Sequence, residues 1–531
     1  MPPSKYSTIA NIRFLIRCSQ NHSPRINTIS IELLALIFHF AKSDPEHEND
    51  PILVYNQNLF VTRLSAVCGH WRRTAIGDGT LWRNISFSPS ILPTVRCAAE
   101  FLQRSRRASL TLMIWNPDLP NTPAVVENPV MTHMLKQLGQ IVDGITDLVA
   151  INPLDIVIRM LTEPATSLVH LDIRTVDAGM TSSIFGGVMP KLEDLTVSNP
   201  VGWKIQPFLN LNIVHLTSTP SKQWRLNDLL DCFDASPAVR ELHLIYFEHF
   251  EPETAAESRR TASLPSLHTL RLTFCDSAPI LGHLEIPPST ALSVYGHHEH
   301  SENILTCLPE SSRFLRMLRG AQYLTVVFDV ERQIFEVDLL GLRGIHLLLG
   351  AVPRHGQFDR KWVLRSMATV ARFAPISGVR WLTMAVDEYR MPWKVWLSKF
   401  DQVSTLEVRC PDPAELLGAL TTPNGNTEDI ICPALRSLSV ERSKRPTDDS
   451  MLLRKCLETQ ASAGRAISTL NLNDLDWTAI PYAEFNAWQN LIDRTRLDGR
   501  QIPPVAFMAF SQRSVVTTGS FTQRENLLLD L

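Results

Sequence analysis

The segment that decides how this chain folds runs Leu264-Pro265-Ser266-Leu267-His268-Thr269-Leu270-Arg271-Leu272. Its last six residues follow the pattern L-x-x-L-x-L. Residues two apart on a β-strand share a face, so Leu270 and Leu272 point to the same side of a sheet, while Leu267 fills the turn that enters the strand. The segment therefore predicts a short strand with one buried face, entered by a turn.

The same pattern occurs at several other places. The apolar triplets are Leu168, Leu171, Ile173; Leu192, Leu195, Val197; Val239, Leu242, Leu244; Leu267, Leu270, Leu272; Val379, Leu382, Met384; Val403, Leu406, Val408; Leu435, Leu438, Val440; and Ile467, Leu470, Leu472. Helical patterns fill some intervals, for instance Trp224 to Phe233, Ala414 to Leu420 and Ser450 to Thr459. We therefore expect an α/β fold of consecutive parallel strands with these leucines inward, and helices on the opposite, convex side.

The repeat is irregular. Neighbouring triplets begin 24 residues apart at 168 and 192 but 32 residues apart at 403 and 435, whereas regular leucine-rich repeats run about 20 to 29 residues. Between Ile280 and Phe373 the best candidate triplet is Ala321, Leu324, Val326, and longer insertions are expected there. The body resembles an irregular leucine-rich-repeat solenoid; a non-repeating α/β domain is the alternative.

Upstream of the repeats, two predicted helices carry more apolar surface than they can bury by themselves. The first runs Ile31-Glu32-Leu33-Leu34-Ala35-Leu36-Ile37-Phe38-His39-Phe40-Ala41, and a helix that is apolar on nearly every side must be covered on all faces. In the second, the residues at helical spacing are Phe60, Leu64, Val67, Trp71 and Ala75, and Leu81-Trp82 adds a large anchor. A loop from Lys42 to Asn58 separates the two. Either a partner supplies the missing cover, or these helices cap the domain that follows.

These residues resemble an F-box. Members of that family typically read L-P-x-E-L-L-x-x-I-F, then L-x-x-V-C-x-x-W-R, then L-W. Here Ile29-Ser30 replaces the usual Leu-Pro, and Ser30 is an acceptable N-cap. The whole chain resembles the large F-box-like families of mushroom-forming fungi. The resemblance implies that an adaptor is bound by Ile31, Leu33, Leu34, Ile37, Phe38, Leu64, Val67, Cys68, Trp71 and Trp82.

The predicted organisation has four parts. An N-terminal extension covers residues 1–24, a small helical F-box head covers 25–89, the repeat-like body covers 90–500, and a C-terminal tail covers 501–531. A helix from Ile91 to Arg107 and a strand from Ser109 to Trp115 form the junction. Because a partner covers part of the head, we expect the head to contribute little to the stability of the body.

Composition argues against several functional classes. Lys plus Arg (51) nearly balance Asp plus Glu (54), so the net charge of −3 provides no field that attracts nucleic acid or an anionic membrane. No uncharged apolar run approaches the roughly 18 to 20 residues that a membrane span needs. Nine cysteines without a C-x-x-C pair indicate reduced thiols in the cytoplasm or nucleus. The basic N-terminal segment leaves a mitochondrial presequence as the alternative.

Motifs of catalysis and cofactor binding are missing from the sequence, which has no G-x-G-x-x-G, no phosphate loop, no G-x-S-x-G and no H-E-x-x-H. Adjacent loop residues point apart, so we interpret His297-His298-Glu299-His300 as a solvated polar loop rather than a metal site. Asp448-Asp449 is interpreted as a helix cap. We expect no metal, no cofactor and no enzymatic activity.

The F-box resemblance implies a substrate-recognition subunit of a cullin-RING (SCF-type) ubiquitin ligase. In that hypothesis the head docks on a Skp-type adaptor, and the body holds a protein target close to the ligase. The main alternative is a leucine-rich-repeat scaffold that acts outside a ubiquitin ligase. An enzyme with an unrecognised site is a third possibility.

Overall fold

The computed structural model divides into two compact units, Met1–Thr290 and Ala291–Leu531, which are described separately. It describes residues 28–42, 51–105, 108–116, 129–153, 157, 161–174, 184–198, 210–219, 223–251, 260–297, 302–309, 321–329, 331–341, 346–353, 358–373, 378–386, 391–421, 431–442, 450–462, 466–473, 488, 491–492, 494–497 and 500–501. Among these residues, no helix combines the length and the apolar character that crossing a membrane requires.

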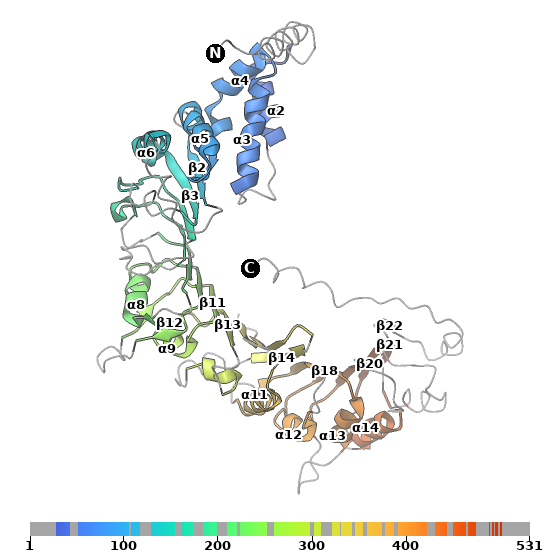
Figure 1. The fold of residues 1–531 in the computed structure, drawn as a ribbon. Coiled ribbons are helices and arrows are strands. Elements are labelled where there is room, and N and C mark those ends of the chain that lie inside the picture. The colour runs from blue at the N-terminus through green and yellow to red at the C-terminus, as the bar shows by residue number, and fades with distance from the viewer. Residues whose placement is uncertain are drawn as a thin grey trace. The chain divides into compact units, whose positions relative to one another are not determined.

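The first helices that the structure describes in the first unit are α2 (Ile31–Lys42), α3 (Pro51–Ser65) and α4 (Gly69–Gly77), followed by the 3-10 turn η3 (Gly79–Trp82) (Figure 1). The continuous helix expected from Phe60 to Ala75 is wrong. The amides of Ala66 and Val67 bond to carbonyls three residues back, which ends α3, and Cys68 is extended before α4 begins. The loop expected from Lys42 to Asn58 is shorter, because α3 begins at Pro51, where a proline is well tolerated.

A parallel sheet follows in the same unit. Its strands pair in the order β1 (Asn84–Phe87), β2 (Leu110–Trp115), β3 (Ile145–Ile151), β4 (His170–Arg174), β5 (Asp194–Ser198), β6 (Ile213–Thr217), β8 (Glu241–Ile245) and β11 (Thr269–Thr273). The helices along this sheet are α5 (Leu92–Ser105), α6 (Pro129–Ile141), α8 (Leu226–Asp234) and α9 (Ser277–Gly282). Shorter elements are η5 (Val142–Gly144), η6 (Ile184–Gly187) and the two-stranded pairs β7 (Gln223–Trp224) with β9 (His249–Phe250) and β10 (Ala262–Ser263) with β12 (Leu284–Glu285).

The predicted leucines form one buried row across this sheet. Leu171 lies beside Leu195, and Leu242 beside Leu270, with Val214 of β6 joining the two pairs in register. All five side chains are at most 1% exposed. The expectation of parallel strands with inward leucines is therefore confirmed here. The L-x-x-L-x-L pattern did not predict strand β6.

The second unit contains a mostly parallel sheet. Its strands pair in the order β13 (Ala291–His297), β16 (His346–Val352), β15 (Ile334–Gly341), β14 (Ala321–Asp329), β17 (Trp381–Val386), β18 (Thr405–Cys410), β19 (Ser437–Arg442), β20 (Thr469–Asn473), β21 (Arg494–Leu497) and β22 (Arg500–Gln501). Its helices are η9 (Ile304–Cys307), α11 (Arg360–Arg372), α12 (Trp393–Leu397), α13 (Pro413–Thr421) and α14 (Ser450–Ser462). A solenoid of parallel strands was expected. The strands of the predicted triplets are parallel, but β15 runs antiparallel to both β14 and β16, and β22 runs antiparallel to β21.

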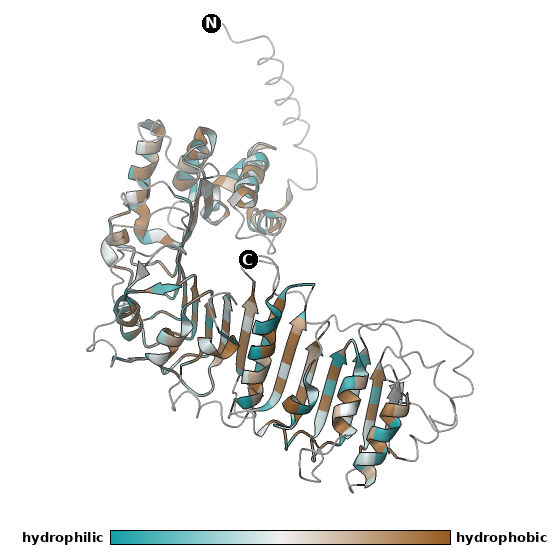
Figure 2. Cartoon of the chain, turned by 60° about the horizontal axis from the view of Figure 1, so that its bottom comes forward, coloured by the Kyte–Doolittle hydropathy of each residue, from teal (hydrophilic) through white to brown (hydrophobic). Residues whose placement is uncertain are grey.

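The sheet of the second unit has two faces, and a row of buried leucines lies on one of them. Leu382, Leu406, Leu438 and Leu470 lie in register on β17, β18, β19 and β20 and are fully buried. Figures 1 and 2 show α11, α12, α13 and α14 in a row along one side of these strands. Side chains at alternate strand positions point away from those leucines. We call the side of the second unit's sheet that lies opposite these leucines its strand face.

The predicted head and body are continuous in the structure. The boundary at residue 89 falls after β1, and β1 pairs in parallel with β2 of the predicted body. Trp82 packs on Phe101 of α5, with ring centroids 5.2 Å apart. The N-terminal helices therefore share a core with the first strands, contrary to the expectation that the head contributes little to the body's stability.

Candidate docking surface

Helix α2 has two apolar faces, and one of them faces solvent. Leu34 and Phe38 are buried, at 0% and 1% exposed. On the other side the exposed fractions are 57% for Leu33, 51% for Leu36, 43% for Ile37 and 73% for Phe40. These four residues are spaced three or four apart, so they share one side of the helix. We call Leu33, Leu36, Ile37 and Phe40 the docking face.

The buried side of α2 is held against α4, which also contacts the residues directly before α2. The Phe38 and Trp71 rings pack with centroids 5.1 Å apart. At the start of α2 the Leu33 amide donates to Ser30 Oγ at 3.4 Å, as the predicted N-cap requires. The His70 ring lies with Nε2 3.2 Å from the carbonyl oxygen of Ile29. These contacts fix which side of α2 is covered and leave the docking face outward.

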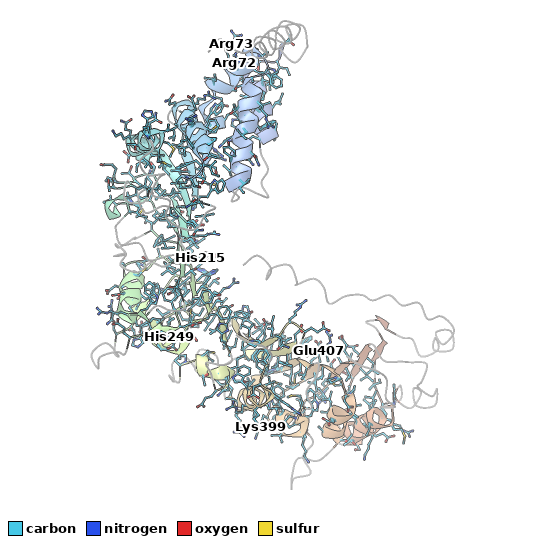
Figure 3. The ribbon with its side chains drawn as sticks, viewed as in Figure 1. Arg72, Arg73, His215, His249, Lys399 and Glu407 are labelled. Atoms are coloured by element: carbon cyan, nitrogen blue, oxygen red, sulfur yellow. The ribbon has the colours of Figure 1, made fainter. Side chains whose placement is uncertain are left out.

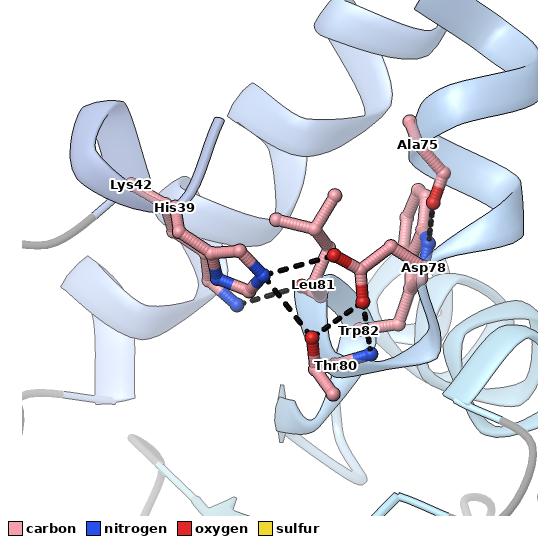
Figure 4. Close-up of polar contacts among 7 residues, drawn as sticks. All are labelled: His39, Lys42, Ala75, Asp78, Thr80, Leu81 and Trp82. Carbon is pink, nitrogen blue, oxygen red and sulfur yellow. Dashed lines mark hydrogen bonds and ion pairs between the residues drawn. The ribbon is translucent and has the colours of Figure 1, made fainter. Parts of the chain in front are cut away.

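A group of hydrogen bonds, which we call the polar joint, connects the C-terminal end of α2 to η3 (Figure 4). Asp78 caps η3 by accepting from the Thr80 amide at 3.0 Å, and His39 Nε2 lies 3.0 Å from Asp78 Oδ2. Burial opposes ionisation of this carboxyl, but hydrogen bonds from Thr80 and His39 outweigh it and lower the pKa of Asp78. The joint holds α2 at a fixed position against η3.

Two further hydrogen bonds complete the joint. Lys42 is 8% exposed, and its Nζ donates to the Leu81 carbonyl oxygen at 2.8 Å. Trp82 Nε1 donates to the Ala75 carbonyl oxygen at 2.7 Å. Both acceptors are backbone groups near helix ends, where carbonyls lack partners within the helix. The two side chains therefore satisfy backbone groups while they connect three separate elements.

The structure divides the predicted adaptor-binding residues into three groups. The exposed residues are Ile31, Leu33, Ile37 and Val67, the partly buried ones are Leu64 and Trp71, and the buried ones are Leu34, Phe38, Cys68 and Trp82. Only the exposed and partly buried groups can touch a partner without rearrangement. Sequence reasoning missed Leu36 and Phe40, although their spacing from Leu33 on an apolar helix was the available signal.

Trp82 belongs to the junction rather than to the docking face. Its ring packs on Phe101, and the central carbon of the Arg104 guanidinium is 4.7 Å from the Trp82 ring centroid. It is 0% exposed. A contact between Trp82 and an adaptor would first require α5 to move away.

Substitution of Gly79 tests how closely η3 packs against the end of α5. A Cβ at residue 79 would lie 2.6 Å from the Ser105 carbonyl oxygen, and backbone cannot give way cheaply. Gly79→Ala should lower the free energy of unfolding by about 1–3 kcal/mol, as overpacking does. Gly77→Ala is the matched control, because a Cβ there meets nothing within 4 Å. Urea unfolding followed by circular dichroism compares them, and equal stability of the two variants would refute a tight junction.

Lys42 should make the stability of this region depend on pH. Burial chiefly, and the nearby Arg83 charge, lower the pKa of Lys42 to about 8, against an opposing effect of Asp78. An unfolded lysine titrates near 10.4, so between about pH 8 and 10.4 the unfolded chain binds more protons and the free energy of unfolding rises with pH. The penalty of burying the charge is complete below pH 8 and disappears as pH increases.

The check is the difference between the wild-type chain and Lys42→Met. Over the window from about pH 8 to 10.4 the wild-type chain should gain on the order of 2–3 kcal/mol relative to the variant, measured by urea unfolding at matched ionic strength. Other titrating groups, including the buried thiols, cancel in this difference. A difference that stays constant with pH would contradict the buried, destabilised ammonium.

Polar side chains elsewhere form ladders on the open faces of the sheets. In the first unit His170 lies between Asp194, at 2.6 Å, and Asp147, at 3.7 Å, and the His215 and His243 rings stack 4.1 Å apart. Burial is the main cause that lowers the pKa of both stacked histidines, that of His243 to about 4. Both rings are therefore neutral at pH 7.

The described residues do not meet the requirements of a metal site. Within the described parts of the chain, no three His, Cys, Asp or Glu side chains come together as a metal site would require. Of the cluster at residues 297–300 the structure describes His297 alone, and Asp448-Asp449 lies outside the described residues. No family model matches the chain, and no curated protein is similar to it.

Proposed function

We propose that this chain is the substrate-recognition subunit of a cullin-RING ubiquitin ligase of the SCF type. Helices α2, α3 and α4 are interpreted as an F-box that docks on a Skp-type adaptor. The strand and helix units behind them are interpreted as an irregular leucine-rich-repeat solenoid that holds a protein target. The proposal carries with it a location in the cytoplasm or nucleus, no catalytic site of its own, and no contact with nucleic acid or membrane.

The observation that carries the proposal is the docking face of α2. Four large apolar side chains are exposed on one side of a helix whose other side is buried in the chain's own core. Scattered exposed apolar residues are ordinary, but a contiguous apolar stripe marks an interaction site. Completing the burial of four such side chains would contribute roughly 1–2 kcal/mol each, which offsets much of the cost of association and leaves the remaining affinity to other contacts.

The proposed mechanism is proximity rather than chemistry. An adaptor held at the docking face connects the chain to the ligase, and a target held by the body experiences a raised effective concentration near it. The shared core of α5, η3 and β1 supports this role, because it fixes the docking face relative to the first strands of the body. Rigid placement reduces the conformational cost of bringing target and ligase together.

The direct experiment measures the full chain against a purified Skp-type adaptor and then against the adaptor–cullin complex. A ligase subunit should bind the adaptor and enter the complex with the cullin in one peak of a size-exclusion column. A scaffold that acts outside a ligase would bind the adaptor but fail to join the cullin. Failure to bind the adaptor at all would remove the F-box interpretation.

A further inference from the structure

We propose that the strand face of the second unit binds an extended protein segment by taking a lysine or arginine side chain over the rings of Tyr323 and Trp381. This deepens the proposed function, since it rests on that function for the view that the bound segment belongs to a ubiquitination target. The binding site itself is argued from the geometry of β14, β15, β17 and β18.

An aromatic pair stands at the centre of this surface. Tyr323 and Trp381 are neighbours on the parallel strands β14 and β17, with ring centroids 5.8 Å apart. Both rings are open to solvent, at 38% and 41% exposed, although the next residue of each strand, Leu324 and Leu382, is fully buried. Tyrosine and tryptophan in this setting are the side chains that most often anchor protein interfaces.

Carboxylates border the aromatic pair along the strands. One row across the sheet holds Asp338, Thr325, Thr383 and Glu407, each paired in register with the next. That row lies two residues along the strands from the Tyr323 and Trp381 row, which places it about 7 Å away. Figure 3 shows Glu407 on the side of the sheet away from Lys399, which follows α12.

Each of these carboxylates has a polar partner among the described residues. Glu407 Oε2 accepts from Thr383 Oγ1 at 3.3 Å, and Asp338 Oδ1 faces His346 Nε2 at 3.2 Å. The next acid along β15, Glu336, accepts from the Tyr295 hydroxyl at 3.0 Å, and burial raises the pKa of its carboxyl. Glu407 is bonded to a hydroxyl rather than to a cationic group, so its negative charge can attract an incoming cation.

The spacing selects a long cationic side chain. A lysine stem reaches about 6 Å and packs along apolar surface while its charged end stays near polar groups. Laid over the Tyr323 and Trp381 rings, its ammonium gains a cation–π contact and reaches the carboxylate row. An acidic side chain would meet like charge there, and a purely apolar one would gain no electrostatic contact with the Glu407 carboxylate.

The comparable face of the first unit also holds acid–base pairs. There His170 lies between Asp147 and Asp194, and the Arg174 guanidinium pairs with Asp172 at 2.7 Å, much as Arg409 pairs with Glu441 in the second unit. Its strand positions also lack exposed large aromatic side chains within the described residues. The open Tyr323 and Trp381 rings beside Glu407 therefore distinguish the second unit.

The test uses the full chain and three fluorescein-labelled pools of nine-residue peptides. The flanking positions vary among Ser, Thr and Val, and the central position is Lys, norleucine or Glu. Norleucine keeps the lysine stem without its charge. Fluorescence anisotropy should show the Lys pool binding at least about fivefold more tightly than the norleucine pool, with the difference falling as salt rises.

Variants then locate the site. Trp381→Ala should weaken binding of the Lys pool about tenfold or more, Trp381→Phe should restore most of it, and Glu407→Gln should weaken it about threefold. Matched controls on the helix side are Val395→Ala, at an exposed apolar residue of α12, and Glu415→Gln, at an exposed acid of α13; neither should change binding.

Several outcomes would overturn the inference: no binding by any pool, equal binding of the Lys and norleucine pools, tighter binding of the Glu pool, or unchanged binding by Trp381→Ala. Adaptor binding is measured on the same preparations. Loss of adaptor binding with retained Lys-peptide binding would defeat the proposed function alone, and the reverse result would defeat this inference alone.

Discussion

Replacing Leu33 and Ile37 together by aspartate should lower the affinity of the full chain for a Skp-type adaptor by at least about 100-fold without unfolding it. Both side chains are exposed in the free chain, so carboxylates there remain solvated and cost little stability. In the complex the same carboxylates would be buried without partners, which costs several kcal/mol. Biolayer interferometry gives the affinity, and circular dichroism with thermal melting gives the fold.

Two further variants make this result specific. Met451→Asp, at a residue of α14 that is 70% exposed, introduces a carboxylate at an exposed apolar position of the second unit and should bind the adaptor normally. Leu34→Asp, on the buried side of α2, should lose both adaptor binding and the folded head. Normal adaptor binding by the Leu33 and Ile37 double variant would show that the docking face is not where the adaptor binds.

The largest effect on stability should come from Trp82→Ala, at about 3–5 kcal/mol. The substitution removes a fully buried ring that packs on Phe101, and it leaves the Ala75 carbonyl oxygen without its indole donor. The loss should be local, because Trp82 joins η3 to α5 beside β1. Hydrogen exchange read by mass spectrometry should therefore show faster exchange in peptides from β1 and α5.

Trp381→Ala is the matched control, since it deletes the same side chain from a position that is 41% exposed, and it should cost at most about 1 kcal/mol. If Trp82→Ala left exchange in β1 and α5 unchanged while it abolished adaptor binding, Trp82 would act at the adaptor interface as the sequence resemblance implied. The observed packing predicts instead that Trp82→Ala increases hydrogen exchange in β1 and α5.

The local pattern of the sequence was enough to find most strands and their buried sides. All eight predicted triplets are buried, and the helices expected near residues 224–233, 414–420 and 450–459 appear as α8, α13 and α14. This worked because strand alternation and helical periodicity are properties of a few neighbouring residues. The junction helix and strand, α5 and β2, were located for the same reason.

Where the pattern weakened, the prediction failed in specific ways. Strand β6 carries Leu211, Val214 and Leu216 at the same spacing. Its middle position is valine, which departs from the L-x-x-L-x-L pattern, so this strand was not predicted. Strand β15 alternates as regularly as its neighbours, and nothing in that alternation records that it runs antiparallel. Strand direction depends on the connections between strands, which lie outside the strand's own sequence.

The sequence by itself determined that α2 is apolar on nearly every side and that some of this surface needs a cover. It could not determine which side the chain covers itself. That was decided by Trp71 packing on Phe38 and by the hydrogen bonds of Lys42 and His39 to the η3 turn, contacts between residues more than 30 positions apart. Trp82, which the motif assigned to the adaptor, is buried for the same reason. Periodicity is local, whereas burial depends on which distant elements meet.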